Sequence, residues 1–195
     1  MEKIVIIGAG FGGLAAAKAL RHANAEIRVI DRANHNLFQP LLYLVAMTVL
    51  SPAQIASPIR QLLKDQQNTT VVLGEVTGIN KDAKFVYVSN EDYKDDPVEY
   101  DTLIIATGVG HSYFGHDEFA DFAPGLKGLA DAVRIRNRVL SSFEREETED
   151  DPILRQDLTT IVLVGGGTNR RGTCRIACGS CSYEVESRVS AYRPC

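Results

Sequence analysis

The chain has 195 residues, 45% of them hydrophobic and 24% charged, and a formal net charge of -4 at pH 7. This composition is that of an ordinary globular protein, and the acidic balance gives no reason to expect a nucleic-acid partner. The chain enters an apolar segment almost at once, without the features of a secretory leader, and no apolar stretch approaches the length of a membrane span. We therefore expect a cytoplasmic protein with one full domain and part of a second.

The first elements, residues 3–31, predict a nucleotide-binding unit. "KIVIIGAGFGGLAAAKALRHANAEIRVID" has the pattern of a buried strand, a glycine turn, a helix and a second strand. Gly8, Gly10 and Gly13 have the G-x-G-x-x-G spacing, which gives a tight turn, a close approach to a pyrophosphate and a close helix–strand contact. Asp31 ends the second strand, where a carboxylate can hold a ribose hydroxyl. Because all these features agree, we predict a dinucleotide site at the start of the helix.

The stretch that follows, residues 31–60, contains no cysteine. A redox dithiol of the kind found in disulfide reductases is therefore not available in this stretch. If the dinucleotide is a redox cofactor, its electrons must pass to a small diffusible acceptor or to another protein. Within it, "NHNLFQPLLYLVA" (34–46) alone would be interpreted as an apolar loop that packs into the core.

Further strands are predicted in the middle of the chain. They are "TTVVLGEVTGI" from Thr69, "KFVYVSN" from Lys84 and "YDTLIIATGVG" from Tyr100, which together predict a small meander. The last of them ends in Ala106-Thr107-Gly108, which is either a core strand with its turn or a second contact with the ligand.

A helix is predicted over residues 128–144, because its apolar residues recur at helical spacing. The acidic run "EREETEDD" after it predicts a solvated end and linker. "TTIVLV" (159–164) then predicts a new strand that leads into three glycines, 165–167. The four histidines lack the spacing of a metal site, so we predict no metal.

The composition changes abruptly at about residue 168. All four cysteines, Cys174, Cys178, Cys181 and Cys195, follow this point. The first three have the C-x3-C-x2-C spacing of the iron–sulfur loop in radical S-adenosylmethionine enzymes, but too few residues follow to build the barrel of those enzymes. We interpret the pattern as accidental.

Several separated motifs resemble one family. The first glycine turn together with "ATG" (106–108) resembles the two-dinucleotide-binding flavoproteins. "NHNLFQPLLYLVA" and "ATGVGHSYFGHDEFADFAPGLKGLADAVRIRNRVLSSFE" (106–144) closely resemble segments of type II NADH dehydrogenases, the single-chain, non-proton-pumping NADH:quinone oxidoreductases. The resemblance covers residues from about 3 to 167.

This resemblance implies an α/β fold with a doubly wound, Rossmann-like FAD-binding domain and a small antiparallel insert, followed by the start of a second nucleotide-binding domain. The expected divisions are an FAD-binding domain at 1–122, a helix and linker at 123–157, the first strand of an NADH domain at 158–167 and a tail at 168–195. In the intact family, NADH gives hydride to FAD and two electrons then pass to a quinone, with peripheral contact at the cytoplasmic face of the membrane.

The resemblance also implies which residues bind FAD, whereas no catalytic residue is assigned. The glycines would act through backbone N–H groups, the aspartate through ribose hydroxyls, the valine through its backbone at the adenine, and the segment at residue 39 by covering the ring. The expected FAD residues are Gly8, Gly10, Phe11, Gly12, Gly13, Asp31, Arg32, Asn34, Gln39, Pro40, Leu41, Val76, Ala106, Thr107 and Gly108.

The tail departs from the family's pattern at Thr168. In the family the second glycine turn continues "GGGPTGVELAG", and codons permitted for residues 168–180, read one base further on, translate as P-T-G-V-E-L-A-G-S-L-A-E. We therefore expect that one inserted nucleotide changed the reading frame at or just before codon 168. Two interpretations of function stay open, an NADH:quinone oxidoreductase and a non-catalytic FAD-binding fragment. The missing segments favour the second for the polypeptide as written.

Overall fold

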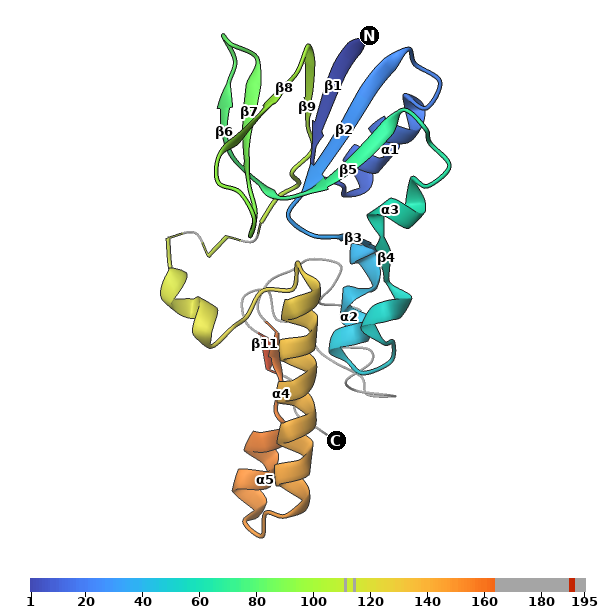
Figure 1. The fold of residues 1–195 in the computed structure, drawn as a ribbon. Helices are drawn as coiled ribbons and strands as arrows, with labels where there is room; N and C mark the ends of the chain where they lie inside the picture. The colour runs from blue at the N-terminus through green and yellow to red at the C-terminus, as the bar shows by residue number, and fades with distance from the viewer. Residues whose placement is uncertain (111, 114, 164–189, 192–195) are drawn as a thin grey trace. The chain divides into compact units, whose positions relative to one another are not determined.

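The computed structural model describes residues 1–110, 112–113, 115–163 and 190–191 (Figure 1). Its contacts divide the chain into two compact units. Unit 1 comprises Met1–Leu37 and Ala56–Val109, and unit 2 comprises Phe38–Ile55 and Gly110–Cys195. The chain thus leaves unit 1 after Leu37 and returns to it at Ala56.

A four-stranded parallel sheet is the centre of unit 1. Its strands are β1 (Glu2–Ile7), β2 (Ala25–Asp31), β5 (Thr69–Leu73) and β9 (Thr102–Ile105), in the order β5-β2-β1-β9. Helix α1 (Phe11–Ala19) connects β1 to its parallel neighbour β2. This is the βαβ arrangement of a nucleotide-binding unit, so the predicted Rossmann-like α/β fold is confirmed.

Alternate residues of β1 enter two different cores. Ile4 and Ile6 lie in a buried cluster with Leu14 of α1, whereas Val5 and Ile7 lie in a second cluster with Val86. A strand that is buried on both faces must be apolar at every position, which explains the unbroken apolar run at the start of the chain. Burial of each such side chain contributes roughly 1.5–3 kcal/mol.

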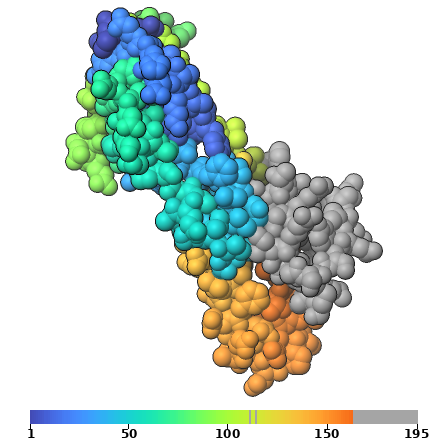
Figure 2. All heavy atoms as spheres, turned by 90° about the vertical axis from the view of Figure 1, so that its right-hand side faces the viewer, coloured from blue at the N-terminus to red at the C-terminus, as the bar shows by residue number. Residues whose placement is uncertain are grey.

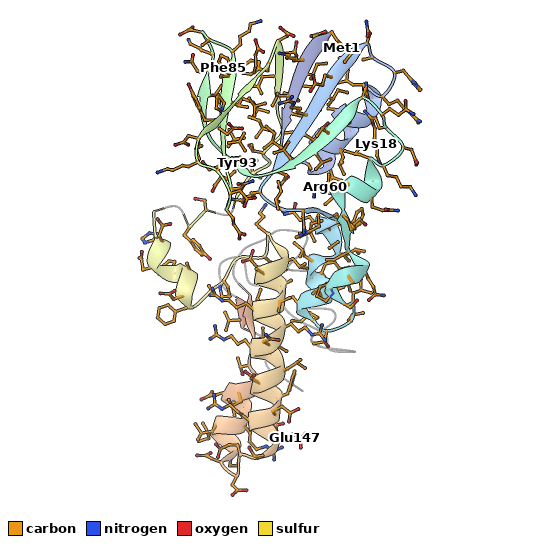
Figure 3. The ribbon with its side chains drawn as sticks, viewed as in Figure 1. Met1, Lys18, Arg60, Phe85, Tyr93 and Glu147 are labelled. Atoms are coloured by element: carbon orange, nitrogen blue, oxygen red, sulfur yellow. The ribbon has the colours of Figure 1, made fainter. Side chains whose placement is uncertain are left out.

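A three-stranded antiparallel sheet provides the second cluster. It consists of β6 (Glu75–Asn80), β7 (Phe85–Ser89) and β8 (Asp96–Glu99), in the order β6-β7-β8. Figure 3 labels Phe85 and Tyr93, which lie at opposite ends of this sheet. The predicted antiparallel insert therefore exists, but its members differ from those expected: β5 and β9 belong to the parallel sheet, and β8 was not predicted.

Shorter elements complete unit 1. Strands β3 (His35–Leu37) and β4 (Ala56–Pro58) pair antiparallel, and α3 (Ile59–Leu62) follows, with Ile59 in the first core cluster. At the start of the sheet, Lys3 of β1 forms an ion pair with Glu99 of β8. The hydrogen bond to Glu99 and the charge of that carboxylate raise the pKa of Lys3.

Unit 2 is mainly helical in its described part. The elements are η1 (Gln39–Leu41), α2 (Leu42–Ala46), η2 (Pro52–Gln54), η3 (Asp117–Asp121), α4 (Leu129–Glu147) and α5 (Pro152–Thr159). Helix α2 packs against α4, where Ala132 is fully buried. Helices α4 and α5 lie side by side in both views (Figures 1 and 2), and Arg155 of α5 pairs with Glu146 of α4. The helix predicted at 128–144 is confirmed and continues to Glu147.

Strand β10 (Val162–Leu163) follows α5 and pairs antiparallel with β11 (Ser190–Ala191). The strand predicted at 159–164 is wrong at its start, because Thr159 is the last residue of helix α5 and the described strand is only Val162–Leu163. Val164 and the three glycines and four cysteines that follow it lie outside the described residues. Within the described ranges, the helices are too short or too polar to cross a bilayer.

Candidate functional site

The turn between β1 and α1 requires glycine at two positions. Gly8 has a φ of +97°, and a Cβ atom there would lie 2.3 Å from the carbonyl oxygen of Ala106. A Cβ atom at Gly13 would lie 1.8 Å from the carbonyl oxygen of Gly8. Any side chain at either position would force the backbone apart. The expected roles of Gly8 in the tight turn and of Gly13 in the close packing of helix on strand therefore agree with the structure.

Gly10 has different surroundings. It is the N-cap of α1 in an extended conformation, and a Cβ atom there would meet nothing within 4 Å. A Cβ atom at Gly12 would meet only the Cβ of Ala106, at 3.9 Å. Both glycines are exposed. The N-terminal end of α1, with its partial positive charge, thus faces open space that an anionic group can enter.

Asp31 lies at the end of β2, beside this turn. Its Oδ2 accepts a hydrogen bond from the Ala9 N–H at 2.6 Å, and its Oδ1 accepts one from the Ala33 N–H at 2.8 Å. The carboxylate therefore holds two turns of the backbone in place. A carboxylate oxygen has a second lone pair, so the group still has the capacity to accept hydroxyl hydrogens of a sugar.

A hollow of about 530 Å³ lies at the carboxyl ends of the parallel strands in unit 1. This is the edge at which open α/β sheets bind their ligands. Five residues expected from the sequence line the hollow: Gly8, Asp31, Arg32, Val76 and Thr107. They come from the ends of β1, β2 and β9 and from β6, so the fold brings together residues that are almost 100 positions apart in sequence.

Of the other expected residues, Phe11 is the first residue of α1, and Gly108, with a φ of +71°, follows β9. The remaining five fall in three places. Ala106 donates its N–H to Ile7 at 2.7 Å, next to the glycine turn. Asn34 is exposed at the start of the segment that forms β3, and its carbonyl accepts the N–H of Ile59. Gln39, Pro40 and Leu41 form η1 in unit 2, so their part in the site stays a prediction.

Sequence reasoning missed one polar contact at the turn. The side-chain amide of Asn36 donates from Nδ2 to the carbonyl oxygen of Ala9 at 2.8 Å. Asn36 is the last residue of "NHN" (34–36), and it lies in β3, which pairs with β4 and contacts the turn through this hydrogen bond. The sequence itself carries no signal for this contact.

Within the described ranges, the contacts of His116 are with residues close to it in the sequence. His116 contacts Glu118 through Nδ1 at 3.2 Å and stacks on Phe119, with 5.1 Å between ring centroids. Among the described residues, no three histidine, cysteine or acidic side chains gather at one point. His111 lies outside them.

The parallel sheet, the glycine turn and the carboxylate at the end of β2 define a protein of the Rossmann-like dinucleotide-binding class. A family model described as pyridine nucleotide-disulphide oxidoreductase matches residues 2–169, and the chain belongs to this family.

Similar proteins place the chain more narrowly within the family. It is 48% identical over 166 residues to the type II NADH:quinone oxidoreductase Ndh of Mycobacterium tuberculosis, a match that covers 85% of this chain and 36% of that protein. It is 34% identical to a probable NADH dehydrogenase of Dictyostelium discoideum, with 85% and 37% covered. The solved structure of NDH2 from Plasmodium falciparum with NADH aligns with a TM-score of 0.70 at 25% identity, over 81% of this chain and 32% of that one. The chain thus spans about a third of these relatives.

Proposed function

We propose that this chain is the FAD-binding portion of an NADH:quinone oxidoreductase of the type II class. The observation that carries the proposal is an open glycine turn beside a hollow at the carboxyl ends of the parallel strands. The Mycobacterium relative that bears this activity in its name is 48% identical over 166 residues, and the family model matches residues 2–169, which contain both features.

The residues present fit a dinucleotide. The N–H groups of Gly10, Phe11 and Gly12 belong to the first turn of α1, where a diphosphate gains from the positive end of the helix. Gly10 has no side chain that could cap the helix, so the ligand can take that role. Asp31 offers its remaining lone pairs to the ribose hydroxyls, and Arg32 adds a positive charge to the wall of the hollow.

The rest of the proposed FAD contacts come from later segments. Val76 in the edge strand β6 offers backbone groups to the adenine. Ala106, Thr107 and Gly108 approach the ligand from the end of β9, together with Asn34 after β2. Gln39, Pro40 and Leu41 cover the flavin ring. Bound FAD would supply the redox chemistry of the intact enzyme, the transfer of two electrons from NADH to a quinone.

The 195-residue polypeptide by itself is proposed to bind FAD but not to turn over quinone. The described residues contain one glycine turn of this kind, and the relatives are about three times longer. NADH and quinone are therefore proposed as substrates of the whole enzyme, and contact with the membrane surface as a property of its remaining segments. The start of the NADH domain, expected at 158–167, is proposed to follow helix α5, with β10 as its first strand.

The test is a cofactor titration followed by an activity assay. The purified chain is incubated with excess FAD, desalted and examined for the flavin absorbance bands, and NADH oxidation is then followed with a soluble quinone. We expect about one FAD per chain and no oxidation above that of free FAD. A colourless protein would refute the proposed cofactor, and brisk quinone-dependent oxidation would refute the proposed loss of activity.

We also propose that residues 168–195 are translated in a shifted frame. The family match ends at residue 169, although the chain continues to residue 195. Sequencing of the genomic DNA across codon 168 tests this. We expect that removal of one base gives an open frame that begins P-T-G-V-E-L-A-G. DNA with no such reading in the alternative frame would overturn the proposal.

A further inference from the structure

Two side chains hold the single residue Ala9 in the middle of the glycine turn. Ala9 is buried, with 1% of its surface exposed. Its N–H donates to Oδ2 of Asp31 at 2.6 Å, and its carbonyl accepts from Nδ2 of Asn36 at 2.8 Å. Both partners follow the turn in sequence by more than 20 residues. The turn is therefore fixed by contacts from outside itself.

The contact with Asn36 sets the direction of a ligand-facing group. A peptide unit is planar and trans, so its C=O and N–H point in opposite directions. The carbonyl of Ala9 belongs to the same peptide unit as the N–H of Gly10. Once Asn36 holds that carbonyl, the N–H of Gly10 must point away from Asn36. A carbonyl that accepts a hydrogen bond also polarises its own peptide unit, which strengthens the N–H as a donor.

The residue that carries this N–H lies on the open side of the turn. Gly10 is exposed at the start of α1, and a Cβ atom there would have no neighbour within 4 Å. Asn36 itself is half-buried behind the turn, in β3, where its register partner is Ser57 of β4. Asn36 is therefore on the protein side of the turn, and the ligand would be on the other.

We propose that Asn36 is a positioning residue for the diphosphate of the bound dinucleotide. It touches no ligand atom, and it acts by orienting the Ala9–Gly10 peptide so that the N–H of Gly10 meets the phosphate oxygens. This inference rests on the proposed function, because it needs FAD at the glycine turn. It assigns to a neutral amide on β3 a share of the affinity for the anionic part of the cofactor.

The test compares three variants of the full chain. Asn36→Leu keeps the size of the side chain and removes the donor. Asn36→His is the rescue, because Nδ1 of histidine is attached at the same side-chain position as Nδ2 of asparagine and can donate from the same place. Asn68→Leu is the matched control. It removes an amide that donates to the carbonyls of Leu20 and Ala23 at the other end of α1, at 3.2 and 3.1 Å.

FAD binding is measured by titration, and ADP and adenosine are measured by competition against FAD. We expect Asn36→Leu to weaken FAD and ADP about five-fold, which is the usual value of one hydrogen bond, and to change adenosine less than two-fold. Asn36→His should restore FAD and ADP to within two-fold. Asn68→Leu should lower the melting temperature without a preference among the three ligands.

Each other outcome has a distinct meaning. If Asn36→Leu binds FAD as the wild type does, or weakens ADP and adenosine equally, the positioning role is wrong while the proposed FAD site stands. If Asn36→His behaves like Asn36→Leu, the donor is not what matters and the inference is equally wrong. If the wild-type chain binds no FAD, the proposed function fails and this inference fails with it.

Discussion

At the scale of single residues, the glycines of the first turn differ in what would prevent their replacement by a residue with a side chain. The protein itself excludes a side chain at Gly13, because it would overlap the backbone of Gly8. The described residues do not exclude a side chain at Gly10, since its φ of -69° suits any residue and a Cβ atom there would meet nothing within 4 Å. A requirement for glycine at position 10 would therefore have to come from the proposed ligand.

This difference gives a prediction for two alanine variants. Gly10→Ala should leave the free energy of unfolding unchanged or slightly higher, because alanine reduces the entropy of the unfolded chain. The same variant should weaken FAD more than about ten-fold, because its methyl group occupies the space of the phosphate. Gly13→Ala should lower the free energy of unfolding by about 1–3 kcal/mol or more, since helix and strand must separate.

Urea unfolding without cofactor and FAD titration measure these two effects separately. Gly10→Ala with wild-type affinity for FAD would mean that the diphosphate lies elsewhere. A Gly10→Ala chain that unfolds as easily as Gly13→Ala would mean that the turn is packed more tightly than the structure indicates.

The residues around this turn also show which contacts can be predicted from the sequence and which cannot. The spacing of Gly8, Gly13 and Asp31 predicts that they lie together at the turn, because all three belong to one local βαβ unit. Asn36 has no such local partner. Its contact with Ala9 depends on the chain returning through β3, and a single amide in a polar run gives no indication of which carbonyl it will meet.

At the scale of elements, the sequence predicts the buried parallel strands and the long helix well. It does not separate β5 from β6, because "TTVVLGEVTGI" is rich in strand-forming residues on both sides of Gly74. The break falls at Gly74, where a Cβ atom would lie 2.6 Å from Cγ1 of Val88. Strand β8 is hard to detect for another reason: it is an edge strand of four residues that includes Pro97, and proline is tolerated only at such an edge.

Helix α5 was missed although its signals are present. Asp151 is the N-cap and accepts the N–H of Ile153 at 2.8 Å, and Pro152 occupies the first turn. Both are standard features of a helix start. The acidic run before them is typical of a linker, so the sequence analysis predicts no helix here, although Asp151-Pro152 marks the start of one.

At the scale of the whole molecule, the two units interleave along the chain. Phe38–Ile55 groups with the residues from Gly110 onward, although it stands between two parts of unit 1. A sequence pattern describes neighbours along the chain, and it cannot show that a segment of 18 residues packs with helices more than 70 positions away.

This arrangement makes a prediction for hydrogen exchange with and without FAD. FAD at about 100 times its Kd should stabilise the bound state by about 2.7 kcal/mol and slow exchange up to about 100-fold where opening exposes the site. The slowing should fall on residues 8–14, 31–36, 74–79 and 105–108, and on 39–41 if η1 covers the flavin ring. Mass spectrometry of peptides measures it.

Helices α4 and α5 serve as the internal control in this experiment, since the hollow in unit 1 involves neither. Equal slowing over residues 129–159 would contradict a cofactor site built mainly on unit 1. Unchanged exchange at 39–41, beside clear protection of the glycine turn, would remove Gln39, Pro40 and Leu41 from the proposed site.

The contact of Gly13 with Gly8 leaves no compressible layer of side chains between α1 and the end of β1. Because close-packed interiors transmit strain, we expect a shift of the helix to be passed to the end of β1 and to the carbonyl of Ala106 beside it. Low compressibility at this point would hold Gly8, which lines the hollow, in a fixed position relative to α1.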